Sequence, residues 1–344
     1  MSPVPASILR ALSITDPSKA SLSTAELGSG FTNTGAIHAK VPSADGQSEE
    51  EHRYFIKTSK VGDTAAKEMF RGEYESLNAI AKCVPGFCPR ALVWGPLDEA
   101  DGTSYFLATE YLDLGVGTRS GQSLAHRLGK LHTTPAPPDP ETGRRRFGFP
   151  VPTFCGDTRQ SNRYYDSWAD FYANERLRAI VETSTARNTR DASLCELVER
   201  TANVVVPALL RDGHLGFDAN GKGEGITPVV VHGDLWSGNA DRGRIIGSGH
   251  GQDEEMGDVV YDPSSCYAHS EYELGIMKMF GGFGSVFFTA YHRIVPKTEP
   301  VDEYEDRVRL YELYHHLNHH AIFGAGYRSG AVSIMQKLLK KYDG

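Results

Sequence analysis

Residues 229–239 read V-V-V-H-G-D-L-W-S-G-N, and this stretch decides how the rest of the chain is interpreted. The run of β-branched valines predicts a short buried strand, and the His-Gly pair after it predicts that the strand opens into a loop. That loop carries a carboxylate at Asp234 and, five residues later, a carboxamide at Asn239. A buried strand that presents both groups on one short loop indicates a catalytic or cation-binding role for that loop.

Transfer of a phosphoryl group from ATP needs this pair of side chains. A carboxylate accepts the proton of the attacking hydroxyl, and an Asn oxygen binds Mg²⁺ on the nucleotide phosphates. The spacing matches the kinase catalytic loop H-R-D-L-x-x-x-N, with Gly233 in place of the Arg. We therefore expect Asp234 to be the catalytic base and Asn239 to be a metal ligand, if the other parts of a kinase follow in order.

The bulk properties agree with a soluble enzyme. The 344 residues are long enough for two lobes, and they are 40% hydrophobic and 23% charged. The net charge of −8 argues against a nucleic-acid partner. The chain has five Cys, no C-x-x-C pair, no secretory signal pattern and no apolar run of membrane-spanning length. We expect a cytoplasmic protein without a membrane contact, either a monomer or a homodimer.

The order of predicted elements indicates an α+β, two-lobed, protein-kinase-like fold. Residues 1–108 read as an antiparallel sheet with one helix and form the expected N-terminal ATP-binding lobe. Residues 109–113 are the expected hinge, and residues 114–344 are the expected catalytic and substrate lobe. That lobe is mainly helical, with helices predicted at residues 122–132, 168–183, 192–210, 267–280 and 301–323.

A kinase needs a lysine on the ATP phosphates and a helix glutamate that holds this lysine. Lys57 ends the strand-like run R-Y-F-I-K, and a helix predicted over residues 64–82 follows it, so Lys57 is preferred to its rival Lys40. Glu73 falls within the apolar stripe of that helix, whereas Glu68 and Glu75 fall on its polar face. A carboxylate that faces inward needs a partner, and Lys57 supplies one.

The remaining nucleotide contacts are predicted by position. Residues 27–35, L-G-S-G-F-T-N-T-G, lie between two predicted strands where a phosphate-covering loop belongs, and they offer Gly28 and Gly30. The same pattern also suits a plain hairpin turn. The strand over residues 105–112 should lead into the hinge, where the backbone groups of Thr109, Glu110 and Tyr111 are candidates for contacts to adenine.

A second metal ligand is expected after the catalytic loop, at the end of another strand. Asp262 follows V-V-Y and precedes a proline that stops the strand, so it is preferred to Asp258. Residues 241–257 between these elements are Gly-rich and acidic, and we expect a lengthened surface loop without chemical function.

These motifs, taken together, resemble the fructosamine and ketosamine 3-kinase family, which is related to the aminoglycoside and choline kinases. The resemblance covers about residues 21–340. It rests on H-G-D-L-W-S-G-N at 232–239 and on further motifs at 69–73, 147–149, 262–265, 267–274, 279–283, 287–293 and 317–319.

The resemblance implies ATP- and Mg²⁺-dependent phosphorylation of the sugar 3-hydroxyl in ketosamines, the Amadori adducts that sugars form on lysines. The phosphorylated adduct is unstable and leaves, so the partners are glycated proteins or small ketosamines, and ribulosamine is favoured over fructosamine. By matching positions, Asp234 is the base, Asn239 and Asp262 bind the metal, and Lys57 with Glu73 anchors the phosphates.

Substrate contacts are less specified. The indole of Trp236 could pack on the sugar or the lysyl stem, or it could anchor the loop. His269, Glu271 and Glu273 could bind sugar hydroxyls or the ammonium of the adduct, or they could be ordinary helix-surface charges.

Two other functions and one other site stay open at this point. The first function is a small-molecule kinase for an amino sugar or a choline-like alcohol, which the W-S-G insert disfavours, and the second is an inactive ATP-binding scaffold. A zinc site on the i, i+4 pairs of His315, His316, His319 and His320 is geometrically possible, but the expected reading of these residues is an ordinary helix.

Overall fold

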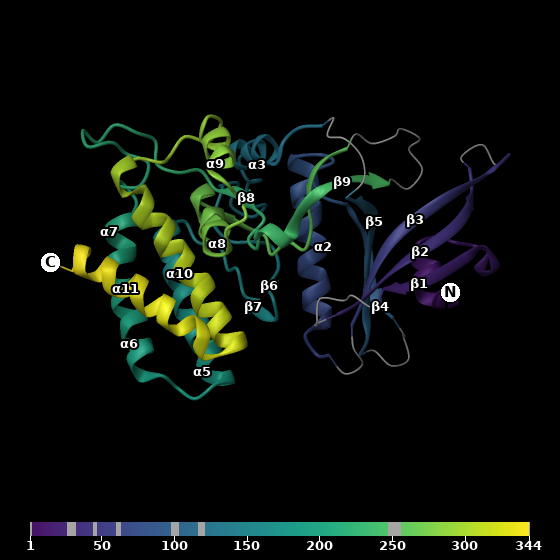
Figure 1. Ribbon diagram of the computed structural model, residues 1–344, viewed down its shortest axis with the longest axis horizontal. Helices are drawn as coiled ribbons and strands as arrows, with labels where there is room; N and C mark the ends of the chain where they lie inside the picture. The colour runs from purple at the N-terminus through teal and green to yellow at the C-terminus, as the bar shows by residue number, and fades with distance from the viewer. Residues whose placement is uncertain are drawn as a thin grey trace. The chain divides into compact units, whose positions relative to one another are not determined.

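The computed structural model describes residues 2–25, 32–43, 47–59, 63–97, 103–115, 121–246 and 256–343. The chain divides into two compact units (Figure 1). The first unit comprises residues Met1–Arg127 and Ala240–Pro263, and the second comprises Leu128–Asn239 and Ser264–Gly344.

The first unit is built on an antiparallel sheet of seven strands, counted over the described residues. The strands are β1 (Ala20–Ala25), β2 (Asn33–Pro42), β3 (Glu49–Thr58), β4 (Ala91–Pro96), β5 (Tyr105–Leu114), β9 (Ala240–Ile246) and β10 (Gly257–Val260). Their order is β1-β2-β3-β5-β9-β10, and β4 also pairs with β5. Alternate residues of β2 are buried, which is the period expected of a strand with one face on a core.

Two helices complete this unit. Helix α2 (Ala66–Cys83) packs on β4 and β5 and buries Phe70, Leu77 and Ile80, as its apolar stripe predicted. Helix α1 (Ala6–Ala11) was not predicted, because six residues are too few for a visible periodicity. It buries Ile8 and Leu9 in one cluster with residues of β2, β3 and β5.

Strands β9 and β10 belong to the first unit, which differs from the division of the chain predicted from the sequence. Residues 114–344 were assigned to the C-terminal lobe, but β9 pairs with the end of β5, and β10 pairs with β9. Residues 241–246 were expected in a loop and instead form β9, whereas the predicted loop residues 247–255 lie outside the described residues. A sheet edge made by residues so far apart in the sequence leaves no local signal.

The second unit is mainly helical. Its helices are α3 (Leu124–Thr133, which begins in the first unit), α4 (Trp168–Phe171), α5 (Ala179–Arg187), α6 (Ala192–Arg200), α7 (Val206–Leu210), α8 (Glu273–Phe280), α9 (Ser285–His292), α10 (Tyr304–Phe323) and α11 (Arg328–Tyr342). Segments 172–178 and 201–205 join α4 to α5 and α6 to α7 as wider π-helical turns.

Helix α10 is central to this unit and packs against α5, α8 and α11 (Figure 1). Its buried Tyr311 hydroxyl accepts a hydrogen bond from the indole N–H of Trp168 at 2.8 Å. Tyr172 and Tyr272 pack their rings edge-on against the same tyrosine. The core of the second unit is therefore a polar-tipped aromatic cluster, in which each hydroxyl can find a partner.

Two short strand pairs lie among these helices. Strands β6 (Thr153–Cys155) and β7 (Thr158–Gln160) form a hairpin, and β8 (Val229–Val231) pairs with β11 (Cys266–Ala268). Residues 267 and 268 were predicted to be helical, and that prediction is wrong. All three residues of β11 are buried against the valines of β8, so strand pairing takes precedence over the helical pattern of the sequence that follows.

Candidate active site

The Asp234 loop leaves β8 through a glycine that no other residue could replace without strain. Gly233 has a φ of +84°, in the left-handed region. A Cβ at this position would lie 2.0 Å from the carbonyl oxygen of Ser264. The loop therefore carries Gly where the protein-kinase motif has Arg, because the backbone around Ser264 leaves no room for a side chain.

A buried carboxylate fixes the same turn from its other side. The backbone N–H groups of His232 and Gly233 both donate to the carboxylate of Glu273, which is about 1% exposed. Burial alone would raise the pKa of Glu273, but His132 and His232 outweigh it and hold the pKa below its ordinary value. Glu273 thus anchors the loop as a carboxylate.

Asp234 and Asn239 are joined within this loop. The side-chain amide of Asn239 donates to the carbonyl oxygen of Asp234 at 2.8 Å, and the Asn239 N–H donates to Trp236 at 2.9 Å. This arrangement uses the amide nitrogen of Asn239, so its oxygen is the atom that a cation could bind. The half-buried Asp234 carboxylate receives a hydrogen bond from Cys155, with 3.6 Å between Sγ and Oδ1.

Trp236 is exposed to 41%, a large fraction for an indole. A Cβ added at Gly238 would lie 2.0 Å from the indole ring, so Gly238 lets the ring fold back over the loop. The ring of Phe280 is 6.2 Å away, centroid to centroid. The W-S-G sequence therefore presents an aromatic surface beside Asp234 instead of burying it.

Lys57, Glu73 and Asp262 form one cluster in the first unit. The Lys57 ammonium donates to Glu73 at 2.7 Å and to Asp262 at 2.6 Å. Burial alone would lower the pKa of Lys57, but Asp262 and Glu73 hold it above the ordinary value, so the side chain is a cation. Burial raises the pKa of Glu73 against the opposing effect of Lys57. Asp262 itself has a φ of +57°, which is uncommon for a residue other than glycine.

The rival residues have other roles. Lys40 is exposed on β2, whereas Lys57 is only 6% exposed. Asp258 accepts the backbone N–H of Leu124 at 2.6 Å, at the first residue of α3. Negative charge at a helix N-terminus is stabilising, so Asp258 stabilises the fold of its own unit.

The predicted hinge residues Thr109, Glu110 and Tyr111 lie inside β5. Glu110 is buried, and Arg90 binds its carboxylate through the guanidinium and the backbone N–H, both at 2.8 Å. The side chain is therefore engaged within the protein, and any nucleotide contact at this position falls to the backbone. Gly28 and Gly30 lie outside the described residues.

The predicted substrate residues His269 and Glu271 are buried, with 2% of each residue exposed. The ring nitrogens of His269 lie 2.9 Å from the Tyr311 hydroxyl and 2.8 Å from that of Thr298. Glu271 forms an ion pair with Arg307 at 2.8 Å. Neither the substrate role nor the surface-charge alternative matches this placement, which joins the segment before α8 to α10.

Sequence reasoning missed two contributors to the loop. Cys155 comes from the β6–β7 hairpin and belongs to no spacing motif, so the sequence alone offered no signal for it. Glu273 was considered only as a substrate ligand or a surface charge. Its place at the start of α8, shortly after a strand that pairs with β8, could have indicated a residue that binds the loop.

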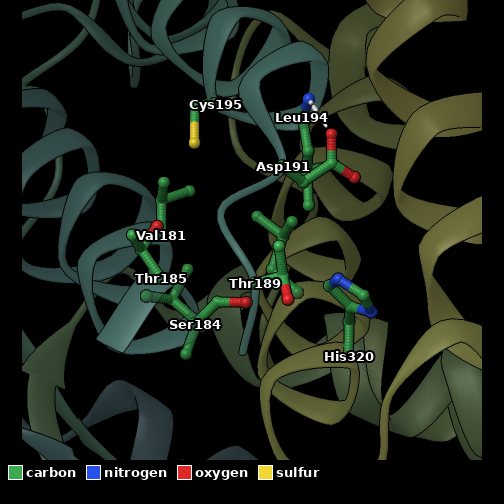
Figure 2. A pocket seen from close by; sticks show the side chains of 10 residues that line it. Val181, Ser184, Thr185, Thr189, Asp191, Leu194, Cys195 and His320 are labelled. Carbon is green, nitrogen blue, oxygen red and sulfur yellow. Dashed lines mark hydrogen bonds between the residues drawn. The ribbon is translucent and has the colours of Figure 1, made fainter. Parts of the chain in front are cut away.

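One pocket of the second unit lies apart from all of these residues. Figure 2 shows it between α5, α6 and α10, with Val181, Cys195 and His320 among the side chains that line it. Asp191 at its rim accepts the Leu194 N–H at 3.0 Å and caps α6. Of the candidate site residues considered from the sequence, the pocket holds only His320, from the zinc alternative, and we assign the pocket no part in the active site.

Comparison with solved structures defines the class of fold. A candidate fructosamine-3-kinase from Thermobifida fusca superposes with a TM-score of 0.68 at 22% identity, covering 93% of each chain. An aminoglycoside phosphotransferase superposes with a TM-score of 0.52 at 13% identity, covering 97% of each chain. The predicted kinase-like fold with an antiparallel sheet and a helical lobe is confirmed.

Comparison of sequences then gives the family. The fructosamine kinase family model matches residues 15–341, and the chain belongs to this family of kinases. The ketosamine-3-kinase of Mus musculus is 33% identical over 308 residues, which cover 85% of this chain and 89% of the relative. A chloroplastic protein-ribulosamine 3-kinase of Arabidopsis thaliana is 31% identical over 293 residues, covering 83% and 76%. Among the described residues, no helix has the length and apolarity to cross a membrane.

Proposed function

We propose that this protein is an ATP-dependent protein-ribulosamine or fructosamine 3-kinase that phosphorylates the sugar 3-hydroxyl of ketosamine adducts on lysines. The observation that carries the proposal is the buried Lys57 cation held between Glu73 and Asp262, at 2.7 and 2.6 Å. A lysine placed between a helix carboxylate and a metal-binding aspartate is the phosphate anchor of kinases. Membership of the fructosamine kinase family supports the choice of acceptor.

The donor atoms suit Mg²⁺, which prefers oxygen ligands. Asp262 uses Oδ1 on Lys57, which leaves Oδ2, and Asn239 uses its amide nitrogen on Asp234, which leaves its oxygen. The register of β9 and β10 pairs Ala240 with Val260, and in the sequence Asn239 directly precedes Ala240 while Asp262 follows Val260 by two residues. This order supports their role as ligands of one ion, which when bound neutralises charge on the phosphate oxygens.

In the proposed reaction, Lys57 binds the phosphates of ATP and Glu73 keeps its ammonium in place. Asp234 accepts the proton of the 3-hydroxyl as that oxygen attacks the γ-phosphorus and the bond to ADP breaks. Such proton transfer contributes about 10²–10⁴-fold in rate. The hydrogen bond from Cys155 and the fixed turn at Gly233 orient the carboxylate for this step.

The other contacts follow from position. The backbone of Thr109, Glu110 and Tyr111 binds adenine, residues 109–113 act as the hinge, and the loop with Gly28 and Gly30 covers the phosphates. The exposed indole of Trp236 packs on the sugar or the lysyl stem of the adduct. A cationic secondary amine beside an indole gains cation–π attraction. Destabilisation of the phosphorylated adduct then repairs the glycated protein, in the cytoplasm.

The test is a side-by-side kinetic comparison of ribulose-lysine and fructose-lysine peptides, with Mg²⁺ and ATP, read out as ADP formed and as phosphorylated peptide. An aminoglycoside and choline serve as alternative acceptors, and the unglycated peptide is the blank. We expect turnover on both ketosamines, with the higher kcat/KM on ribulosamine. Turnover only on choline or the aminoglycoside would select the small-molecule kinase instead, and no turnover by folded protein would refute the proposal.

A further inference from the structure

His315 on α10 is a buried histidine that the proposed reaction does not use. His315 is 0% exposed, and neither of its ring nitrogens has a hydrogen-bond partner within the part of the chain that the structure describes. Burying a polar group without a partner is unfavourable, because the group loses its hydrogen bonds to water. A bound ion would provide a partner for one of these two nitrogens.

The His315 ring packs against Tyr272 and Tyr314, and a thiol and a carboxylate lie close to one of its nitrogens. A ring nitrogen of His315, Sγ of Cys155 and a carboxylate oxygen of Asp234 all lie within 4.8 Å of one another. The three residues come from α10, β6 and the loop after β8, so they meet inside one unit. The backbone also ties α10 to β6, since the Asn318 amide donates to the carbonyl oxygen of Cys155 at 3.2 Å.

The spacing of the cluster suits a tetrahedral ion. With a Zn–S bond of about 2.3 Å and a Zn–O bond of about 2.1 Å, two ligands at the tetrahedral angle lie about 3.6 Å apart. The observed separation of Cys155 Sγ and Asp234 Oδ1 is 3.6 Å. The ring nitrogen of His315 lies within 4.8 Å of the other two ligand atoms, so a small movement of the imidazole would bring it to a similar separation. Three protein ligands with the fourth position open is an arrangement known from catalytic zinc sites, in which water or substrate takes the fourth position.

The chemistry of the donors separates this cluster from the magnesium ligands. Sulfur, nitrogen and one oxygen suit a borderline ion such as Zn²⁺, whereas Mg²⁺ prefers oxygen alone. Binding releases one proton, because the Cys155 thiol becomes a thiolate while the neutral imidazole of His315 donates its lone pair. The half-buried carboxylate of Asp234 gives the ion a path from solvent.

We propose that Cys155, Asp234 and His315 form a binding site for Zn²⁺, and that its occupancy inhibits the kinase by engaging Asp234. Zinc binding stands on the cluster alone, whereas the inhibition rests on the proposed function of Asp234 as the base. The i, i+4 histidine pairs are not the site. His316 binds Glu312 at 3.2 Å, and His319 and His320 each bind a backbone carbonyl oxygen of α10 or the residue after it.

The binding test uses Co²⁺ as a spectroscopic stand-in and Zn²⁺ in equilibrium dialysis, both in excess Mg²⁺. For the wild-type protein we expect one ion per chain and a thiolate-to-cobalt charge-transfer band, which Zn²⁺ abolishes. Cys155→Ser should remove the band, and His315→Gln should weaken binding at least tenfold. His316→Gln and Cys195→Ser are matched controls that should bind as the wild type does. Absence of the band from the folded wild type would overturn the site, as would equal binding by Cys155→Ser.

The inhibition test titrates Zn²⁺ into the ketosamine assay at saturating Mg²⁺ and ATP. We expect Cys155→Ser to need at least tenfold more Zn²⁺ than the wild type for half-inhibition, measured relative to its own uninhibited rate. Equal sensitivity of the two proteins would overturn the inhibition. If no ketosamine is turned over, the proposed function fails, while the dialysis and the cobalt spectrum still decide the site.

Discussion

Substitution of Gly233 by Ala tests how the loop is held. The φ of +84° costs a residue with a Cβ roughly 1–2 kcal/mol. The new methyl group would also lie 2.0 Å from the Ser264 carbonyl oxygen, so the backbone must shift. Shifts of this kind cost typically about 1–3 kcal/mol. The sum predicts a loss of about 2–5 kcal/mol in the free energy of unfolding.

Gly213→Ala is the matched control for this substitution. Gly213 lies in the same unit with a φ of +76°, and no atom lies within 4 Å of its hypothetical Cβ. It should lose only the roughly 1–2 kcal/mol of the left-handed backbone. The gap between the two variants, about 1–3 kcal/mol, therefore measures the contact of Gly233 with Ser264.

The assay is urea unfolding of both variants, followed by kcat on a ketosamine peptide. Gly233→Ala should also lose about 10²-fold in kcat, since the shift displaces the neighbouring Asp234 and a misplacement near 1 Å has this effect. Gly213→Ala should keep its kcat. If the two variants unfold within about 0.5 kcal/mol of each other, or if Gly233→Ala keeps full activity, the explanation of the H-G-D motif is refuted.

Three further outcomes follow from the structure. Glu73→Gln should lower kcat/KM about 10–100-fold, because Lys57 loses the carboxylate that holds its ammonium. Glu75→Gln on the same helix should leave kcat/KM unchanged. Equal kinetics of the two variants would contradict the role of Glu73 in holding Lys57. Trp236→Ala should raise the KM for ketosamine peptides about fivefold, a loss of about 1 kcal/mol, with unfolding nearly unchanged because the indole is 41% exposed; an unchanged KM would exclude the substrate contact. Burial lowers the pKa of His269 from 6.5 to about 4. As the pH falls, the unfolded chain therefore binds a proton on this histidine before the folded protein does, and the free energy of unfolding decreases. Urea unfolding should show a decrease of about 2 kcal/mol between pH 7 and 5, and His269→Asn should reduce this decrease.

Local patterns predicted the residues whose roles depend on periodicity and spacing. The apolar stripe of α2 placed Glu73 inward, and the strand before it placed Lys57 where the two could meet. The loop at Asp234 was recognisable because a strand, a glycine and a carboxylate follow one another directly. Asp262 was predicted from its strand and proline, and it lies at the ammonium of Lys57.

Contacts between distant segments could not be read in the same way. Glu271 carries a charge in a helical pattern, which indicated the surface, yet Arg307 from α10 pairs with it in the core. The meeting of Cys155 with His315 depends on how a hairpin packs against α10, and neither residue lies in a motif with the other. Buried polar pairs of this kind are set by tertiary packing, so a single sequence leaves them undetermined.

Asp234→Asn tests the central claim most directly. The measurement is phosphoryl transfer from ATP to a ribulose-lysine peptide, made alongside the nucleotide dissociation constant in the presence of Mg²⁺. If Asp234 is the base in a ketosamine kinase, the variant binds nucleotide within a few-fold of the wild type and its turnover falls by about 10²–10⁴. Turnover equal to that of the wild type would contradict the account.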